Sequence, residues 1–281
     1  MSVEGSRSRL SPDQVRELAE RLYTAWRDGS TLPPLVKQGY RTDIESAYRV
    51  SRRVLETRQR EHGERLIGKK IGVTSDAVQS MLNVFQPDFG FLTDSMRYAD
   101  GARIPVAGAP AAGAPAVGKL IQPRGEGEIA FLLKSGLRGP GVTEQQVLQA
   151  TDRIMPCLEI VDSRIEDWQI TIEDTIADNA SCGVFVLGGD SADPRELDLP
   201  ALQMQMFKND SLVAEGSGSA VQGNPLTAVA WLANTLGEMD IPFEAGEIIL
   251  SGALVPLVPV GPGDRLRVTL AGVGDCSCEF S

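Results

Sequence analysis

Apolar side chains recur at helical spacing through the first sixty residues. Ser11, Pro12 and Gln14 have the order of an N-cap, a first-turn proline and the last member of a capping box. One apolar face follows, made of Val15, Leu18, Leu22 and Trp26. A second capping box, Thr42-Asp43-Ile44-Glu45, begins a helix that we expect to end near Gly63. This part of the chain is therefore predicted to be helical.

Beyond Gly63 the apolar residues occur in short runs that are typical of strands. The predicted strands are residues 67–73, 128–133, 154–161, 183–187, 247–250 and 265–270, with a hairpin joining 204–207 to 212–214. Two helices interrupt them, one capped by Asn224 and a shorter one that begins after Thr143. The chain is predicted to have an α+β fold, with an N-terminal helical region at 1–66 and a β-rich body at 67–281.

Two segments have the composition of loops. Pro87-Asp88-Phe89-Gly90 is rich in turn-forming residues. Residues 105–119 hold three tandem pentapeptides of Pro, Ala, Gly and Val that end on a lysine and lack an amphipathic period. We expect both segments to be loops, and we assign the tandem no chemical role.

The composition is that of an acidic globular protein. Of its 281 residues 42% are hydrophobic and 23% are charged, and its 29 Gly and 17 Pro favour a β-containing fold with many loops over a helical bundle. The net charge of −11 argues against a nucleic acid or an anionic membrane as a partner, because either requires a basic face. Without an apolar run of membrane-spanning length or a hydrophobic signal core, the expected compartment is the cytoplasm.

The sequence also restricts histidine and cysteine chemistry. The only histidine, His62, lies in a polar run, which argues against a buried His dyad and against a metal site with two His ligands. No two cysteines form a CxxC pair, so we expect free thiols and no zinc site at Cys157, Cys182, Cys276 and Cys278.

Three glutamates are candidate metal ligands. Glu126 and Glu128 are two residues apart, so an extended strand points both to one face, and Gly125 and Gly127 are expected to leave them room. Glu159 lies in an apolar strand, where a carboxylate needs a cation or a metal. Together they would suit Mg²⁺ or Mn²⁺ and leave coordination positions open. The alternatives are a solvated strand face for the first pair and an ion pair from Glu159 to Arg164 or another cation.

Lys69 and Lys70 adjoin in a short strand between two glycines. If the strand is buried on one side, one lysine faces inward, and the pattern does not decide which. An inward lysine would neutralise a substrate carboxylate or move a proton at a lowered pKa. The alternative is a pair of surface lysines.

Residues 174–183 combine small polar side chains with a glycine ahead of an apolar strand. This pattern is typical of a loop that offers backbone N–H groups and a hydroxyl to a ligand. The alternative is a turn that only begins the strand.

Seven segments between residue 67 and the C-terminus form a co-linear set. They are IGKKIGVTSDAVQSML (67–82), QPDFGFLTD (86–94), LIQPRGEGEIAFLL (120–133), PCLEIVDSRIEDW (156–168), DTIADNASCGVFVLG (174–188), AVAWLANTLG (228–237) and GEIILSGALVPL (246–257). In this order they resemble the 2-keto-4-pentenoate hydratase (2-hydroxypenta-2,4-dienoate hydratase) family of the fumarylacetoacetate hydrolase superfamily. Residues 1–66 match this family only loosely.

The resemblance implies a fold, a metal and a set of site residues. The fold would be a mixed β-roll of the fumarylacetoacetate hydrolase C-terminal type, preceded by the helical part. Mg²⁺ or Mn²⁺ would be bound by Glu126, Glu128 and Glu159. The catalytic residues would be Lys70 from the GxKxG pattern, Asp88 from PDFG and the substrate-contacting Ser181 from ADNAS. The family also implies a homo-oligomer, pentameric or decameric, with a pathway aldolase or decarboxylase as a candidate partner.

The implied activity is that of a hydro-lyase. It adds water to 2-hydroxypenta-2,4-dienoate (2-oxopent-4-enoate) and gives 4-hydroxy-2-oxopentanoate in the meta-cleavage degradation of aromatic compounds. A proton moves to C5 and water then adds at C4.

Three alternative functions lead away from hydration. The first is the related 4-oxalocrotonate decarboxylase, whose family pattern has an apolar residue where this chain has Asp88. The second is C–C bond hydrolysis with a His–Glu pair, but His62 lies outside every motif. The third is a non-catalytic homologue that acts as a binding partner, against which the intact Lys70, Asp88 and three glutamates argue.

Overall fold

The computed structural model describes residues 9–74, 79–80, 86–106 and 119–281. Residues 107–118, which make up most of the predicted Pro-Ala-Gly loop, lie outside the described residues. None of the helices in the described ranges is both long and apolar enough to cross a bilayer.

The α-helices are α1 (Pro12–Asp28), α2 (Ile44–His62), α4 (Glu144–Ala150), α5 (Ile172–Ala177) and α6 (Pro225–Gly237). The strands are β1 (Leu66–Gly72), β2 (Asp88–Thr93), β3 (Arg97–Ala99), β4 (Ala102–Ile104), β5 (Arg124–Leu133), β6 (Thr151–Val161), β7 (Cys182–Leu187), β8 (Gln203–Lys208), β9 (Ser211–Ser217), β10 (Ile248–Ala253), β11 (Val258–Pro259), β12 (Arg265–Leu270) and β13 (Gly274–Phe280). Short 3₁₀ helices are η1 (Leu35–Gln38), η2 (Asp94–Met96), η3 (Glu166–Trp168), η4 (Pro194–Glu196), η5 (Leu199–Ala201) and η6 (Gly218–Ala220).

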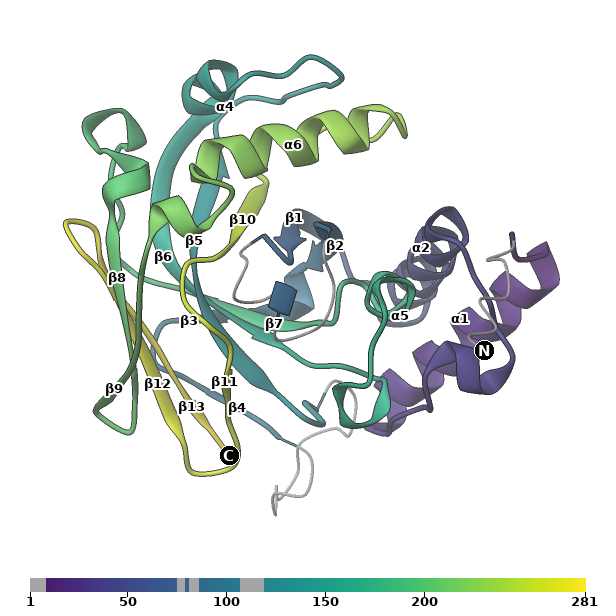
Figure 1. Cartoon of the computed structure of the whole chain (residues 1–281). Helices are drawn as coiled ribbons and strands as arrows, with labels where there is room; N and C mark the ends of the chain where they lie inside the picture. The colour runs from purple at the N-terminus through teal and green to yellow at the C-terminus, as the bar shows by residue number, and fades with distance from the viewer. Residues whose placement is uncertain (1–8, 75–78, 81–85, 107–118) are drawn as a thin grey trace.

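The two N-terminal helices form where the capping residues predict them. Ser11 and Gln14 make the expected reciprocal capping box at the start of α1. Helix α2 ends at Gly63 as predicted, but Asp43 rather than Thr42 caps its first turn by accepting a hydrogen bond from the N–H of Ser46. The two helices pack on each other and α2 packs on α5, to one side of the sheets (Figure 1).

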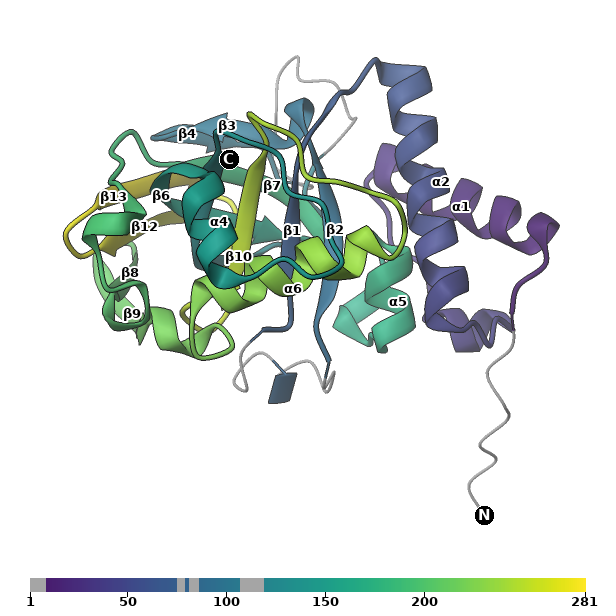
Figure 2. The same cartoon turned by 90° about the horizontal axis from the view of Figure 1, so that it is seen from above.

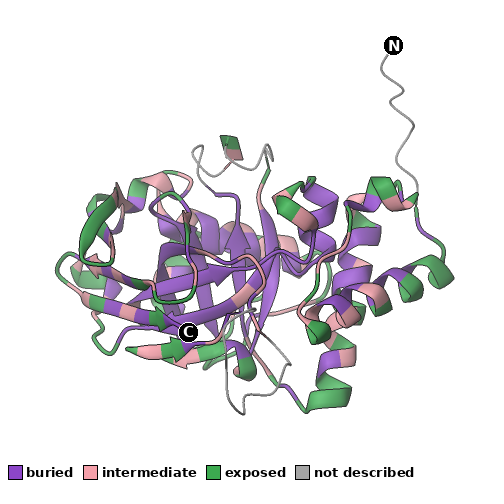
Figure 3. Cartoon of the chain, turned by 90° about the horizontal axis from the view of Figure 1, so that it is seen from below, coloured by how far each residue is buried: buried purple, intermediate pink, exposed green. Residues whose placement is uncertain are grey.

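Most strands belong to a mixed eight-stranded sheet in the order β2-β1-β10-β5-β6-β7-β3, with β11 paired to β5. Strand β1 runs parallel to β10 and antiparallel to β2. Helix α6 packs across β10 and β1 (Figure 2), so it covers one face of this sheet. The central strands are mostly buried on both faces, as the purple that predominates along them in Figure 3 shows.

A second, five-stranded sheet has the order β4-β13-β12-β8-β9. Its strands β12 and β13 pack on β6 of the larger sheet. The two sheets and the N-terminal helices confirm the predicted α+β fold, and the hairpin β8–β9 is confirmed with it.

Two segments predicted as loops are regular elements. Residues 88–90 belong to β2, because pairing with β1 buries the alternating Phe89 and Phe91 and outweighs the turn-forming neighbours. Residues 174–177 belong to α5, where Thr171 and Asp174 form a capping box. The loop that we expected there begins only at Asp178.

Candidate active site

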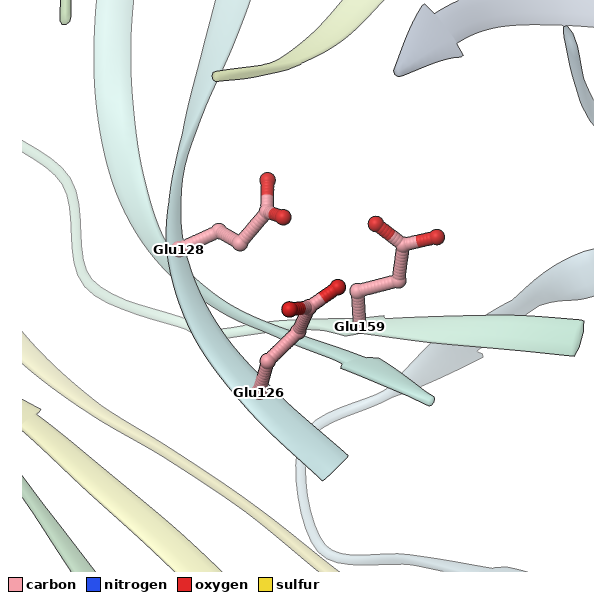
Figure 4. A group of neighbouring side chains, drawn as sticks. All are labelled: Glu126, Glu128 and Glu159. Carbon is pink, nitrogen blue, oxygen red and sulfur yellow. The ribbon is translucent and has the colours of Figure 1, made fainter. Parts of the chain in front are cut away.

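The three candidate metal ligands meet on one face of two paired strands. Glu126 on β5 lies directly opposite Glu159 on β6, and Glu128 follows two residues along β5. One carboxylate oxygen of each residue lies within 4.8 Å of the others, and the side chains converge on a shared space (Figure 4). Their exposed fractions are 5%, 0% and 0% in the order Glu126, Glu128 and Glu159, which excludes a solvated strand face.

Half of these six carboxylate oxygens are buried without a hydrogen-bond donor among the described residues. Only Oε2 of Glu128 has a hydrogen-bond donor from the backbone, the N–H of Gly252 at 2.8 Å. Its Oε1 and both oxygens of Glu159 are buried without a hydrogen bond. Lys70 Nζ lies 3.2 Å from Glu159 Oε1, an ion-pair distance without hydrogen-bond alignment. The alternative of an ion pair from Glu159 to Arg164 or another cation is wrong for Arg164, which is bonded to Asp178, but the ion-pair distance to Lys70 agrees with its second form.

The electrostatics of this cluster fit a divalent cation. Burial, and then the neighbouring Glu159, raise the pKa of Glu126 to about 8. The same two causes raise the pKa of Glu128 well above its ordinary value. Carboxylates that are buried, mutually repelling and short of donors are stabilised in their charged form by a hard cation with oxygen ligands. The residues present therefore fit Mg²⁺ or a similar ion.

Gly125 and Gly127, which alternate with the two glutamates along β5, face the opposite side of the strand. A Cβ on Gly125 would lie 2.2 Å from Leu266, and one on Gly127 would lie 2.4 Å from Met204. Both contacts belong to the five-stranded sheet. The glycines therefore let the two sheets approach closely, and the expectation that they make room for the carboxylates is wrong.

Both lysines of β1 are buried, on opposite faces of the sheet. The expectation of one inward lysine fails because both faces of β1 are covered. Lys70 is 2% exposed and faces the glutamates, whereas Lys69 is 1% exposed and is hydrogen-bonded to Glu247 and to the carbonyl of Pro242. Burial alone would lower the pKa of Lys70, but the carboxylates of Glu159 and Asp88 outweigh it and raise that pKa. The side chain is therefore an ammonium, which favours charge neutralisation over proton transfer at a lowered pKa.

Asp88 lies beside Lys70 at the start of β2. It is paired with Gly72 on β1, where a Cβ would lie 2.2 Å from its carboxylate oxygen. Thr175 donates a 3.0 Å hydrogen bond to Asp88 Oδ2, while Oδ1 is buried without a donor among the described residues. Burial raises the pKa of Asp88, and Lys70 offsets only part of that effect.

Ser181 is carried by an unusual turn between α5 and β7. Asn179, Ala180 and Ser181 have φ angles of 56°, 52° and 50°, the left-handed region that non-glycine residues rarely adopt. The Ser181 hydroxyl lies 3.5 Å from that of Thr175. Lys70, Asp88 and Ser181 thus gather around the glutamates.

Two buried side chains hold this turn. Arg164 donates to Asp178 Oδ1 at 2.5 Å, to the carbonyl of Asp178 at 2.8 Å and to that of Cys182 at 3.2 Å. The amide of Asn179 accepts from the N–H of Phe91 at 2.8 Å and donates to its carbonyl at 3.0 Å. Sequence reasoning missed both roles, although Arg164 and Asn179 lie inside the quoted motifs.

These residues surround a pocket of about 320 Å³, measured out to its open mouth. Its polar part includes Lys70, Asp88, Glu126, Thr175 and Ser181. Its apolar part includes Val73, Val161, Trp168, Ile170 and Leu257. The pocket therefore suits an anionic head group joined to a short apolar tail.

Comparisons with known proteins agree with this arrangement. The family model for the fumarylacetoacetate (FAA) hydrolase C-terminal region matches residues 69–281. A 2-hydroxyhexa-2,4-dienoate hydratase of Comamonas testosteroni is 58% identical over 267 residues, 95% of this chain and 97% of that protein. A 2-hydroxypent-2,4-dienoate hydratase of Pseudomonas putida is 52% identical over 227 residues, 81% of this chain and 97% of that protein.

A solved structure is similar over almost the whole chain. It is 4-oxalocrotonate decarboxylase from Pseudomonas putida G7, complexed with magnesium and adipate, with a TM-score of 0.88 and 34% identity. The match covers 98% of this chain and 100% of that chain. The chain therefore belongs to the 2-keto-4-pentenoate hydratase family of the fumarylacetoacetate hydrolase superfamily.

Proposed function

We propose that the protein is a metal-dependent hydratase that acts on a 2-hydroxy-2,4-dienoate in the meta-cleavage degradation of aromatic compounds. With 2-hydroxypenta-2,4-dienoate the product would be 4-hydroxy-2-oxopentanoate. One observation carries the proposal: three buried glutamates, two of which have oxygens without a hydrogen-bond donor among the described residues, adjoin a pocket that also contains Lys70 and Asp88. The hydratase relatives at 58% and 52% identity support the choice of reaction.

The metal would be held by Glu126, Glu128 and Glu159. A bound Mg²⁺ or Mn²⁺ supplies the positive charge that orients the carboxylate and 2-oxygen of the substrate and withdraws electrons from its conjugated chain. The magnesium in the similar decarboxylase structure supports Mg²⁺. The pocket gives no preference between the two ions.

Lys70 would balance the charge of the site. Three ionised carboxylates exceed the charge of a divalent cation by one unit, so an anionic substrate would be repelled without a further cation. The raised pKa of Lys70 keeps its ammonium charged beside Glu159. Because Lys70 is the cation among the described residues that line the pocket, it is the group that can offset the substrate's negative charge there.

Asp88 would accept a proton from the attacking water. Thr175 holds one carboxylate oxygen and leaves the other without a donor, which is the geometry needed for a base. Its raised pKa makes it a stronger base than an exposed aspartate. Ser181 lines the same pocket, with its hydroxyl 3.5 Å from that of Thr175, and would contact the substrate beside Asp88.

The test is turnover of enzymatically generated 2-hydroxypenta-2,4-dienoate with and without Mg²⁺ or Mn²⁺, with the product identified by NMR in deuterated water. Asp88→Asn should lose formation of 4-hydroxy-2-oxopentanoate by about 100-fold while deuterium exchange at C5 continues. An equal loss of both steps would make Asp88 a proton carrier for C5 instead. Absence of any hydration by the metal-loaded protein would refute the proposal.

The decarboxylase alternative rests on the structural similarity to 4-oxalocrotonate decarboxylase. The same samples should be given a 2-hydroxymuconate-type dienol, with release of carbon dioxide as the measurement. Faster carbon dioxide release than hydration of the pentadienoate would place the protein in the decarboxylase branch.

The proposal extends to assembly and location. The family resemblance supports a cytoplasmic homo-oligomer, pentameric or decameric, that can associate with a pathway aldolase or decarboxylase. It also supports the division into a helical region at 1–66 and a catalytic body at 67–281. Analytical ultracentrifugation of the full chain, alone and with a candidate partner enzyme, tests the assembly.

A further inference from the structure

Part of the apolar lining of the pocket comes from a small hydrophobic cluster of its own. Val161, Ala253 and Leu257 are buried against one another, apart from the two larger cores of the described residues, and Trp168 packs on them. Three of these four residues, Val161, Leu257 and Trp168, also line the pocket. The cluster therefore presents an apolar surface to whatever occupies the pocket.

Trp168 is fixed in place by several contacts. Its Nε1–H donates to the carbonyl of Gln122 at 2.9 Å, and the guanidinium of Arg124 lies 4.5 Å from its ring centre. The side-chain amide of Gln122 is in turn bonded to the carbonyl of Ser163 at 2.8 Å. The indole is therefore a rigid part of the wall, although the residue is only half-buried.

The backbone under Trp168 is strained. Asp167 and Trp168 have φ angles of 54° and 55°, in the left-handed region that side chains other than glycine rarely adopt. Such strain persists where the surrounding contacts hold it, and it concentrates at binding sites. Here it places the largest side chain of the pocket against the apolar cluster.

The charged and apolar sides of the pocket fix the direction of a bound dienoate. Its carboxylate belongs beside Lys70 and the glutamates, so the far end of its carbon chain meets the apolar residues. We propose that Trp168 closes this far end and limits the length of the alkyl tail beyond C5 that the enzyme accepts. This inference rests on the proposed hydratase function and names its specificity-determining residue.

The experiment compares kcat/KM for 2-hydroxy-2,4-dienoates with five, six and eight carbons. Trp168→Ala should raise the ratio of the eight-carbon to the five-carbon substrate by about tenfold or more, because removing the indole opens space for roughly two further methylene groups. Trp168→Phe should give a smaller rise in the same direction. Trp231→Ala is the matched control, since Trp231 lies on α6 outside the pocket lining, and it should leave the ratio unchanged.

The outcomes separate this inference from the proposed function. An unchanged ratio in both Trp168 variants, with five-carbon turnover retained, would overturn the role of Trp168 and leave the hydratase intact. An equal loss for all three substrates would show a merely structural role and would also overturn it. If Trp168→Ala does not fold, Trp168→Phe and Leu257→Ala carry the test. Failure of the wild-type protein to hydrate any of the three substrates would instead refute the proposed function.

Discussion

Two adjacent lysines on one strand have the same degree of burial and opposite surroundings. Lys69 faces the segment between α6 and β10, where Glu247, the carbonyl of Pro242 and the ring of Phe243 surround its ammonium group. Lys70 faces the pocket, where Glu159 is close enough for an ion pair but three carboxylates, those of Asp88, Glu128 and Glu159, keep oxygens without donors among the described residues. Burial alone therefore does not distinguish a structural charge from a chemical one.

The difference lies in whether the partners are satisfied. A buried charge whose partners are all bonded holds elements together, as Lys69 does between β1 and the segment before β10. A buried charge among oxygens that lack hydrogen-bond donors indicates a site where a bound ligand supplies the missing partners. Arg164 belongs to the first kind, because its donors are bonded to Asp178 and to backbone carbonyls.

Removing the metal should have the largest effect on the Lys70 face. Exhaustive chelation is expected to abolish hydration, and Mg²⁺ or Mn²⁺ should restore it, because the glutamates cannot hold the substrate without a cation between them. Glu159→Gln should weaken Mg²⁺ affinity by tenfold or more, measured by calorimetry. Glu247→Gln, on the opposite face, is the matched control and should bind Mg²⁺ as the wild type does. Full activity of metal-free protein would contradict the site.

Lys70→Ala should reduce kcat by about 100- to 1,000-fold, since the negative charge of the substrate then has no cation other than the metal to oppose it. Circular dichroism should show an intact fold. A Lys70→Ala variant with more activity than Lys69→Ala would reverse the assignment of the two faces.

Lys69→Ala should instead act on stability. It leaves Glu247 buried without its cation, which costs about 3–5 kcal/mol in the free energy of unfolding. Urea denaturation measures this loss, and kcat at a permissive temperature should stay within about fivefold of the wild type. Lys69→Met, which keeps the packing against Phe243, should still lose the ion pair. If both substitutions leave stability unchanged, Lys69 is not the structural partner described here.

The smallest expected effect is on the stability of the metal-free protein, which should depend on pH. The pKa of Glu126 is about 8 in the folded protein and near its ordinary value of 4.5 in the unfolded chain. Between pH 4.5 and pH 8 the folded state therefore keeps a proton on Glu126 that the unfolded chain has lost. Because the folded state binds more protons, the free energy of unfolding falls as the pH rises from 4.5 to 8. We expect a decrease in Tm on the order of 5 °C, reversed by Mg²⁺, and Glu126→Gln should flatten the profile. A metal-free Tm that rises over this range would contradict the raised pKa.

Local signals predicted the parts of the fold that depend on neighbouring residues. Capping residues located α1, α4 and α6, and short apolar runs located the central strands. The same-face pair Glu126 and Glu128 was visible for the same reason, because it needs only the geometry of one strand. Whether Lys70 or Lys69 faced the site came from the family resemblance and not from the pattern.

Long-range contacts explain what the sequence did not predict. Lys69 is buried against Glu247. The two residues are 178 positions apart in the chain, a separation that no local pattern covers. The residues around Asp88 have the composition of a turn, and only their pairing with β1 makes them a strand. The left-handed turn at Ser181 was equally hidden, since it lacks the glycine that usually marks such a backbone.

The amide of Asn179 has a consequence for how this family can change. Its hydrogen bonds among the described residues are to the backbone N–H and carbonyl of residue 91, so any side chain that fits the core at position 91 keeps both bonds. Position 179 has no such latitude, because aspartate would lose the donor and leucine would lose both groups. Random substitution should therefore be tolerated better at position 91 than at position 179, although the two residues are bonded to each other. A library of active variants should vary at Phe91 and keep asparagine at 179.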